Sequence, residues 1–569
     1  MDANQTTKRS DLLRRWGEMK AERSTWMAHW QELSAFLLPR SGRYFIQDRN
    51  RGARRHNNIY DSTGTRAVRV LAAGMMSGMT SPARPWFRLA TPDKELNKHQ
   101  PVKLWLADVT ALMLSVFNKS NVYRALHQTY EELGVFGTSA KVVMDDFTNV
   151  VHHASLTAGE YAIATDYKGN VDTLCREFEK TVSEVVREFG YKNCSTAVQS
   201  LYDAGTLGAW VPIIHIIEPR ADRERDPKSK LAKDMAWRSC YFEQGAQSDQ
   251  YLRESGFREF PALCSRWAVS GGDIYGNSPG MEALGDVKQL QQQQLRKAQA
   301  IDYMTKPPLM APSSMKNSEV EMLPGGVSFG DGEGIRTAFE VKLDLSHMLA
   351  DIQDVRERVK GAFYADLFMM LASMDTGRMT ATEVAERHEE KMLMLGPTVE
   401  RLHNEELNPL IQSTFNRMLR AGMLPPPPQE LNGVMLQVDF ISMLAQAQRA
   451  IGTNSVDRFV GNLGQIAAFA PGVLDKFDAD DWADEYSDML GISPSLVVAN
   501  DKVALIRQGR AEQQAAAQKA AQANQQADTM QKLGNAPTNG NNALSALVSG
   551  GGLVKTGPGD PSAGFSGYT

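Results

Sequence analysis

The stretch YGNSPGMEALGDVKQL, residues 275–290, decides how the second half of the chain folds. It contains the pattern G-x-S-x-G, in which some hydrolases present a serine nucleophile on a tight turn between a strand and a helix. In that turn the residue after the serine donates its backbone N–H to the oxyanion hole, and Pro279 has no N–H. The same residues fit a helix start, with Ser278 as N-cap, Pro279 at the first helical position and Glu282 in the first turn. We therefore expect a structural serine, not a nucleophile.

The helix that starts at Ser278 must stop at KPP, since Pro307 and Pro308 cannot continue it. A Gly-rich insert follows, roughly residues 307–342. A second long helix is predicted from about 344 to 371, because its apolar residues recur every three or four positions. Two long helices that flank a small β insert predict a protruding arm.

The chain before this arm has the pattern of an α+β body. Residues 10–38 carry one apolar helix face, and helical patterns recur at 62–76 and 101–117 with a strand-like PWFRLAT between them. Between about residues 139 and 267 the sequence contains six short strand-like runs: AKVVMDD (140–146), EYAIATD (160–166), VDTLCREFE (171–179), VPIIHII (211–217), AWRSCYFE (236–243) and FPALCSRWAV (260–269). YKGN (167–170), between the second and third runs, predicts a hairpin turn. The segment 39–58 has six arginines against one aspartate. Such a loop suits DNA, an acidic partner, a subunit contact or plain solvent.

The chain after the arm is expected to be helical and then low in complexity. The linker ASMDTGR (372–378) predicts a mobile loop. Thr380 and Glu383 form a capping box, and the helix that they open runs to about residue 419 with interruptions at Pro397 and Pro409. Four prolines at 425–428 mark a boundary before further helices. Beyond about residue 535 the chain is too polar to fold alone.

The composition limits the functions that the protein can have. The 569 residues are 42% hydrophobic and 23% charged, which is ordinary for a protein with several structural units. A formal net charge of -5 gives no general attraction to nucleic acid, so any DNA contact is local or weak. The four dispersed cysteines fit reduced thiols, and neither a signal sequence nor a membrane-spanning stretch is present.

Three patterns imitate cofactor sites. His152 and His153 are adjacent, so on a strand they point to opposite faces. The acidic cluster with His388 at residues 386–390 does not converge on one ion when it is helical. GGGLVKTG near the C-terminus has Val554 where a P-loop needs glycine. We expect no metal site, no cofactor and no catalytic residue.

Several stretches, in this order and at these separations, resemble the portal (head-to-tail connector) proteins of short-tailed bacteriophages. The resemblance covers nearly the whole chain up to about residue 525. The stretches that carry it are GEYAIATDYKGNVDTLCREFEKTV (159–182), WRSCYFE (237–243), LRESGFREFPALCSRW (252–267), YGNSPGMEALGDVKQL (275–290), KPP (306–308), MTATEV (379–384) and VDFISMLAQAQRA (438–450).

The resemblance implies an α+β, mainly helical portal fold that assembles as a twelve-subunit ring. It divides the chain into a wing (1–277), a first stem helix (278–306), a clip (307–342), a second stem helix (343–371), a channel loop and long wing helix (372–424), a helical crown (425–530) and a low-complexity tail (531–569). The ring would occupy one capsid vertex of the virion, after assembly in the host cytoplasm. It would conduct double-stranded DNA during packaging and ejection.

The resemblance also implies site residues and partners. The channel loop is Ser373, Met374, Asp375, Thr376, Gly377 and Arg378. Arg356, Arg358 and Lys360 are candidate contacts to DNA in the channel, without sequence specificity. Pro307, Pro308, Gly325 and Gly326 belong to the clip, which would dock the terminase packaging motor and tail adaptor proteins. Major capsid and scaffolding proteins are further expected partners, and a membrane is not.

Two other functions stay open at this point. A monomeric tail adaptor or internal virion protein would share the phage setting, but should lack the pattern of two stem helices around a clip. A hydrolase using Ser278 would need a base and an acid beside that serine. The portal interpretation requires an ATPase in a partner, because this chain has no credible nucleotide site.

Overall fold

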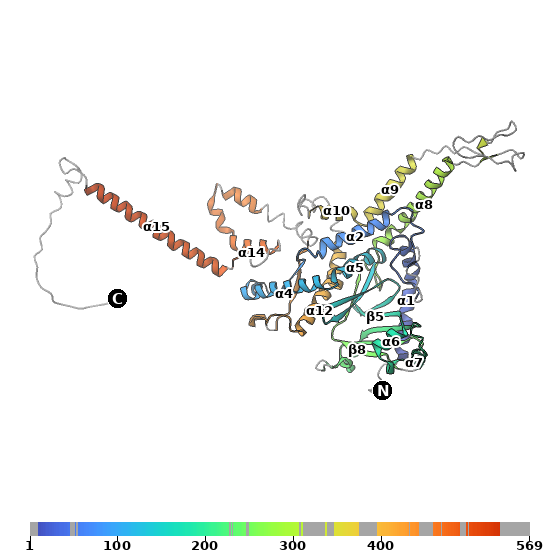
Figure 1. Ribbon diagram of the computed structural model, residues 1–569. Coiled ribbons are helices and arrows are strands. Elements are labelled where there is room, and N and C mark those ends of the chain that lie inside the picture. Colours follow the sequence, from blue (N-terminus) through green and yellow to red (C-terminus); the bar gives the residue numbers. More distant parts are fainter. Residues whose placement is uncertain are drawn as a thin grey trace, which may run out of the picture. The chain divides into compact units, whose positions relative to one another are not determined.

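The computed structural model describes residues 9–45, 52, 55–226, 229, 231–245, 250–305, 309–310, 336–337, 346–374, 395–431, 433–442, 459–467, 469–489, 497–498 and 500–534. The chain divides into two compact units, residues 1–494 and 495–569. The second unit contributes one described helix, α15 (Asn500–Gly534). The first unit holds every other described element and is a mixed α+β body (Figure 1).

Among its described residues, the first unit has four antiparallel sheets. The largest has the strand order β4–β5–β6–β7–β8, a three-stranded sheet has the order β3–β2–β9, and the pairs β1–β12 and β10–β11 complete the set. The strands are β1 (Phe87–Ala90), β2 (Thr138–Asp146), β3 (Val150–Leu156), β4 (Tyr161–Thr165), β5 (Val171–Thr181), β6 (Trp210–Pro219), β7 (Trp237–Glu243), β8 (Arg253–Phe257), β9 (Ala262–Arg266), β10 (Leu309–Met310), β11 (Arg336–Thr337) and β12 (Gln437–Phe440).

The strand-like runs of the sequence become β2, β4, β5, β6, β7 and β9, and YKGN forms the turn between β4 and β5. Strands β3 and β8 had not been predicted. His152 and His153 lie on β3, one exposed and one buried, as alternation along a strand requires. The α+β fold class is confirmed.

Helices make up most of the other described elements of the first unit. They are α1 (Arg9–Phe36), α2 (Thr63–Met79), α3 (Lys94–Lys98), α4 (Gln100–Lys119), α5 (Val122–Phe136), α6 (Val182–Phe189), α7 (Thr196–Asp203), α8 (Pro279–Thr305), α9 (Ser346–Ala362), α10 (Ala365–Met374), α12 (Asn408–Arg420) and α14 (Ala479–Met489). Helix α5 had not been predicted.

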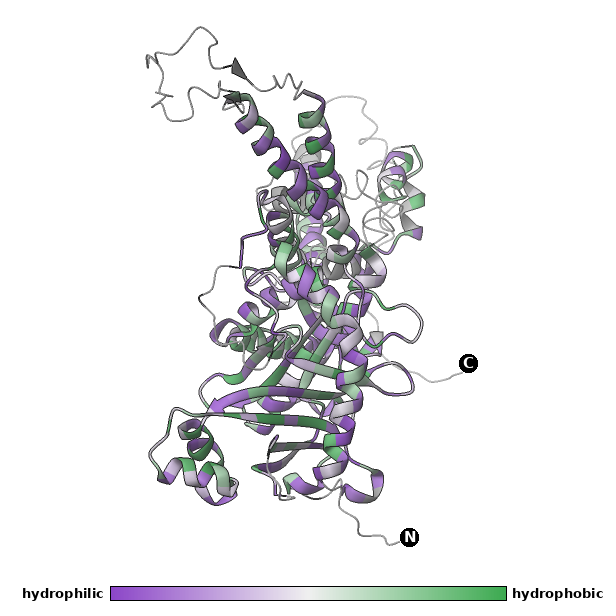
Figure 2. Ribbon diagram, turned by 90° about the vertical axis from the view of Figure 1, so that its right-hand side faces the viewer, coloured by the Kyte–Doolittle hydropathy of each residue, from purple (hydrophilic) through white to green (hydrophobic). Residues whose placement is uncertain are grey.

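Helices α8 and α9 pack along each other and form the arm that the sequence predicted (Figures 1 and 2). Near the body their apolar residues are buried, as at Val287 and Val355. Toward the outer end of the pair large apolar side chains are exposed, by 41% at Ile301, 47% at Met304 and 49% at Leu349. One chain therefore leaves apolar surface on its arm uncovered.

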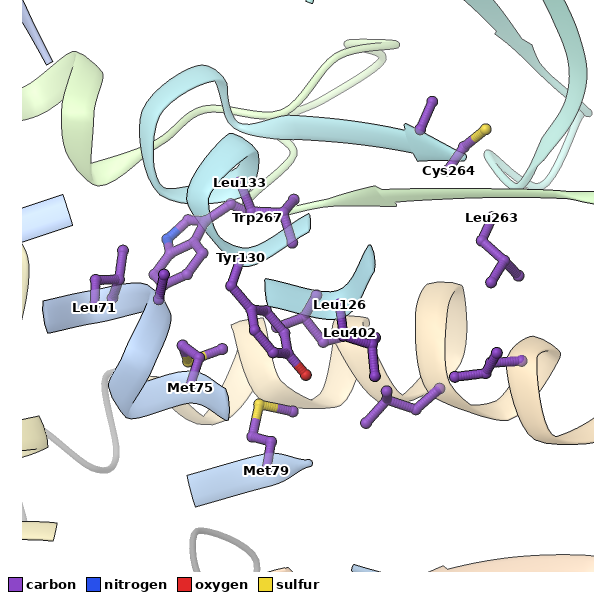
Figure 3. Close-up of a cluster of buried hydrophobic side chains, with 14 of the residues drawn as sticks. Leu71, Met75, Met79, Leu126, Tyr130, Leu133, Leu263, Cys264, Trp267 and Leu402 are labelled. Atoms are coloured by element: carbon purple, nitrogen blue, oxygen red, sulfur yellow. The ribbon is translucent and has the colours of Figure 1, made fainter. Parts of the chain in front are cut away.

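The main core lies where α2, α5, the three-stranded sheet and the helical residues 395–402 meet (Figure 3). Small residues on α2 let its neighbours approach closely. A Cβ added to Gly74 would lie 2.2 Å from Cγ of Phe368 on α10, so α2 and α10 touch where only glycine fits. Side chains from distant parts of the sequence fill this core: Leu71, Met75, Met79, Leu126, Tyr130, Leu133, Leu263, Cys264, Trp267 and Leu402.

Two predicted helices differ from expectation. The second arm helix is not continuous from 344 to 371, because it breaks between α9 and α10 at Tyr364, whose φ of 53° is left-handed. Pro409 does not interrupt its helix. A π-helical turn at His403–Leu407 precedes α12, and its wider spacing accommodates a proline that has no N–H to donate.

Residues 425–442 also differ from expectation, since they had been assigned to the crown. In the structure these residues are part of the body, where β12 pairs with β1 and Phe440 lies opposite Phe87. The backbone N–H of Ile441 continues the pairing by donating to the carbonyl of Trp86. The four prolines at 425–428 therefore lie in a loop that leads from α12 back to the sheet with β1.

Candidate functional site

Ser278 lies directly before α8 and only 1% of it is exposed. Its hydroxyl donates to the carbonyl oxygen of Val135 at 2.7 Å and accepts the backbone N–H of Met281 at 3.1 Å. The loop before it crosses the end of α5 so closely that a Cβ on Gly276 would lie 2.2 Å from the carbonyl oxygen of Gly137. The serine thus caps a helix and ties it to α5, and its hydroxyl is fully used.

A polar junction joins the arm to the body. We call it the Asp61 junction; it comprises Asp61, Gln291, Gln294 and Arg356. The buried side-chain oxygen of Gln291 accepts the backbone N–H groups of Tyr60 and Asp61 at 2.7 and 2.8 Å. The Asp61 carboxylate accepts from Gln294 at 3.0 Å and from the Arg356 guanidinium at 2.8 Å. One aspartate therefore holds both arm helices.

The charge state of Asp61 follows from these contacts. Burial acts to raise its pKa, but hydrogen bonds from Thr63 and Arg356 outweigh burial and hold the pKa below its ordinary value. Asp61 is therefore ionised at neutral pH and pairs with the arginine of α9. Gln291 and Gln294, the first and last residues of a run of four glutamines on α8, are both members of this junction.

The three basic residues expected in the channel lie on α9, but two of them are engaged within the chain. Arg356 belongs to the Asp61 junction. Arg358 lies 3.3 Å from the Asp286 carboxylate on α8 and 3.4 Å from Asp354 on its own helix. Lys360 is exposed. Of the three, only Lys360 has no ion pair among the described contacts.

Two of the six residues predicted for the channel loop are not in a loop. Ser373 and Met374 are the last residues of α10 and are therefore helical. The reason is that α10 continues its hydrogen-bonded turns through both residues. The loop residues Asp375, Thr376, Gly377 and Arg378 lie outside the described residues, as do the clip residues Pro307, Pro308, Gly325 and Gly326 and the cluster at 386–390.

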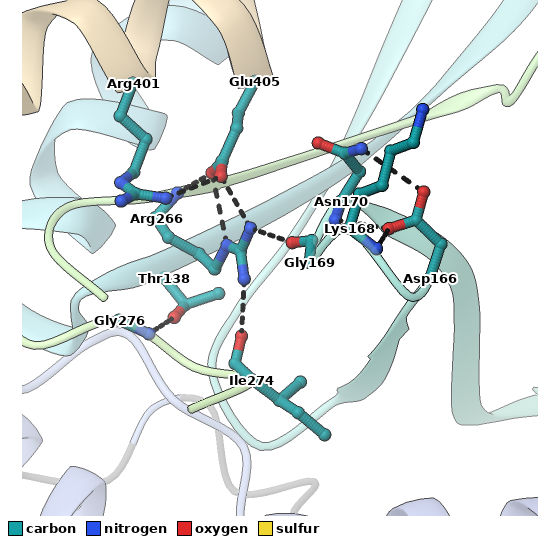
Figure 4. Close-up of polar contacts among 10 residues, drawn as sticks. All are labelled: Thr138, Asp166, Lys168, Gly169, Asn170, Arg266, Ile274, Gly276, Arg401 and Glu405. Carbon is teal, nitrogen blue, oxygen red and sulfur yellow. Dashed lines mark hydrogen bonds and ion pairs between the residues drawn. The ribbon is translucent and has the colours of Figure 1, made fainter. Parts of the chain in front are cut away.

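Two ion pairs anchor the π-helical turn to the three-stranded sheet. Lys141 on β2 is 1% exposed and pairs with Glu406, which also accepts the hydroxyl of Ser265 at 2.8 Å. On β9, the Arg266 guanidinium pairs with Glu405 at 2.6 Å and donates to the carbonyl oxygen of Gly169 at 2.7 Å (Figure 4). Neither pair was predicted from the sequence. The first has a signal there, because Lys141 is a charge set between Ala140 and the apolar run Val142 and Val143.

The described residues do not form a metal or thiolate site. Among them, no three His, Cys, Asp or Glu side chains are placed to hold a metal ion. All four cysteines are buried and free, and burial raises the pKa of Cys194 to about 11 and that of Cys240 to about 12. Burial disfavours the charged form of His153 as well, and for this base it lowers the pKa well below the usual value. No helix in the described part of the chain is both long and apolar enough to cross a membrane.

Comparison with known proteins gives matches along almost the full length. Residues 9–498 match the family described as "Bacteriophage head to tail connecting protein". The chain is 63% identical to the "Probable portal protein" of Bordetella phage BPP-1, over 99% of both chains. It is 45% identical to the "Portal protein" of Salmonella phage epsilon15, over 96% of this chain and 99% of the relative.

Solved structures give more distant matches. A chain from "Virion of native gene transfer agent (GTA) particle" has a TM-score of 0.33 at 11% identity, over 82% of this chain and 99% of the other. A chain from "Neck of empty GTA particle computed with C6 symmetry" has a TM-score of 0.34 at 12% identity, over 80% and 96% of the two chains. Both likenesses are remote.

Proposed function

The chain belongs to the family of bacteriophage head-to-tail connecting, or portal, proteins, and from this we propose that it closes into a twelve-subunit ring at one capsid vertex. The observation that carries the proposal is the match with two portal proteins along almost the whole chain. The similarity is therefore to complete portal proteins and not to one segment of them. In this role the protein conducts double-stranded DNA into and out of the capsid.

The arm supports a ring. Its outer end exposes Ile301, Met304 and Leu349, and apolar side chains grouped in this way are usually covered by another surface. Neighbouring copies around a closed ring supply such a surface through a head-to-tail contact that repeats until the ring closes. In this proposal α8, α9 and α10 form the stem, residues 307–342 the clip and the segment after residue 442 the crown.

The charges of α9 suit a conduit. Every phosphate that a Lys or Arg holds adds affinity and slows sliding, so a channel for DNA of any sequence needs few free cations. Arg356 and Arg358 already form ion pairs with Asp61 and Asp286, respectively. We assign weak contact with DNA first to Lys360 and then to Arg378 in the channel loop, which is confined to residues 375–378 because Ser373 and Met374 belong to α10.

The remaining roles follow from the family. The clip, with Pro307, Pro308, Gly325 and Gly326, docks a terminase motor during packaging and tail adaptor proteins afterwards, while the wing meets capsid and scaffolding proteins. The protein assembles in the host cytoplasm and stays in the virion at the head-to-tail junction. Ser278 has no catalytic role in this proposal, because its hydroxyl caps α8 and is bonded to the carbonyl of Val135.

Negative-stain electron microscopy and mass photometry of the purified chain test the proposal. We expect rings with a central hole and a mass near twelve subunits. A monodisperse monomer over a range of salt and protein concentrations would refute the ring and favour a tail adaptor.

A further inference from the structure

The two arm helices run antiparallel in a register that two side-chain contacts define. Gln293 of α8 donates to the Asp351 carboxylate of α9, and the Asp286 carboxylate of α8 lies 3.3 Å from the Arg358 guanidinium of α9. Gln293 lies seven residues after Asp286, and Asp351 lies seven residues before Arg358, so both contacts belong to one register. A residue that follows Gln293 is therefore level with the residue that precedes Asp351 by the same distance.

This register places two leucines level with each other on opposite sides of the arm. Leu295 follows Gln293 by two residues, and Leu349 precedes Asp351 by two residues. Because an α-helix turns about 100° per residue, each leucine lies about 200° around its helix from the α8–α9 contact and points away from the other helix. Leu349 is 49% exposed, and Leu295 is partly exposed. Each side of the arm therefore carries an apolar side chain at the same height.

Within one turn of these leucines the two sides of the arm are uncharged. We call them the α8 flank, which comprises Leu295, Ala298 and Gln299, and the α9 flank, which comprises Ser346, Leu349 and Gln353. Arg296 and Asp354 are exposed as well, but each lies three residues from the α8–α9 contact and therefore about 60° from it, on the open face of the arm. Two copies of a chain with a formal net charge of -5 repel each other in general, so flanks without charge suit contact between copies.

We propose that the α8 flank of one subunit packs on the α9 flank of the next, with Leu295 of one copy against Leu349 of its neighbour. This inference rests on the proposed ring and names the surface through which its arms meet. Because the two flanks differ, the contact is head-to-tail, and each subunit uses one flank on either side, as closure into a ring requires. The contact covers apolar surface that a single chain leaves exposed.

Disulfide cross-linking of the assembled full-length protein tests the contact. Leu295→Cys and Leu349→Cys are combined in one chain, and the assembled protein is oxidised by dioxygen with a copper–phenanthroline catalyst. Within one arm the two sites are separated by the width of two helices, about 20 Å, whereas the Cβ atoms of a disulfide lie about 4 Å apart. A disulfide must therefore join neighbouring subunits. We expect a ladder of bands up to the full ring on a denaturing gel without reductant.

Further variants show the direction and the position of the contact. Neither Leu295→Cys nor Leu349→Cys alone should cross-link, whereas the two single variants assembled together should give dimers and no longer species. The four native cysteines are buried and should not react. Leu295→Cys with Glu357→Cys is the matched control, since Glu357 is exposed on α9 but lies eight residues, about 12 Å, from Leu349. We expect about tenfold less cross-linked product from this control.

Electron microscopy of each sample before oxidation separates the contact from the ring. Rings of the double variant that cross-link no more than the control overturn the contact and leave the proposed ring intact. Dimers from Leu349→Cys alone also overturn the contact, because they require two α9 flanks to meet. A wild type that stays monomeric overturns both proposals.

An exchange of charge gives a second test that needs no oxidation. Leu295→Lys places a charge against Leu349 of the neighbour, so we expect about tenfold fewer subunits in rings by mass photometry, at an unchanged melting temperature. Leu295→Lys with Leu349→Glu should restore the rings, because the two new charges meet across subunits. Rings of Leu295→Lys as abundant as those of wild type, or a double variant that assembles no better than Leu295→Lys, overturn the contact.

Discussion

Ser278 uses its hydroxyl twice, and its replacement separates a structural serine from a catalytic one. Ser278→Ala removes the N-cap of α8 and the hydrogen bond to Val135. We expect a loss of about 1 to 2 kcal/mol in the free energy of unfolding. Denaturant unfolding measures this loss, and ring formation should be retained. A catalytic serine would show the reverse, with esterase activity lost and stability unchanged.

Glu132 makes stability depend on pH. Its pKa rises from an ordinary 4.5 in the unfolded chain to about 7 in the fold, so the folded state binds the extra proton between these values. The stabilisation is complete below about pH 4.5 and is lost as the pH rises through 7, by at most about 3 kcal/mol. Urea unfolding from pH 5 to pH 8 should show this decline in wild type. Glu132→Gln should flatten it, and an equal slope in both proteins would contradict the assignment.

Lys141 and Glu406 form a buried ion pair, so removal of either charge alone leaves the other charge buried and unpaired. Lys141→Met leaves the buried Glu406 without its cation, and we expect a cost of about 3 to 5 kcal/mol. The double variant Lys141→Met with Glu406→Leu removes both charges and should recover most of that loss. A double variant no more stable than the single one would show that the pair itself supplies the stability.

At the scale of elements, the close packing of α10 on α2 depends on one glycine. Gly74→Ala places a methyl group 2.2 Å from the ring of Phe368 and should destabilise the protein by about 1 to 3 kcal/mol. Gly17→Ala on α1 is the matched control. No atom lies within 4 Å of its added methyl group, so the better helix propensity of alanine should stabilise α1 by up to about 1 kcal/mol. We expect Gly74→Ala to lower the melting temperature and Gly17→Ala to raise it.

The sequence predicted the elements whose signals are local. Ser278 with Pro279 marks a helix start, Pro307 marks a helix end, and YKGN marks a turn, because each acts through its own backbone. The break at Tyr364 and the π-helical turn that accommodates Pro409 were not predicted, because neither is marked by a residue that ends or starts a helix through its own backbone. The Asp61 junction was missed because Asp61 and Arg356 lie far apart in the sequence and meet only in the fold.

At the scale of the whole molecule, the exposed end of the arm should decide assembly. Ile301→Asp introduces a charge on a side chain that is already 41% exposed, so a single subunit should fold normally. In a ring that charge would lie against an apolar neighbour, at a cost that repeats at every contact. We expect subunits that do not assemble but keep their melting temperature, measured by mass photometry and thermal denaturation. Tyr167→Asp, at the exposed tip of the β4–β5 hairpin, is the control and should still form rings.

The pairing of β1 with β12 has a consequence for synthesis of the protein. Phe87 and Phe440 are neighbours in this small sheet, although more than half of the chain separates them. During translation β1 leaves the ribosome long before β12 has been made. Until then the backbone N–H and C=O groups along one edge of β1 are unpaired and can pair with strands of other chains. Folding of the body can therefore be completed only after residue 440 has been made. Subunits should enter assembly as finished chains, and a message truncated before that codon should yield aggregates.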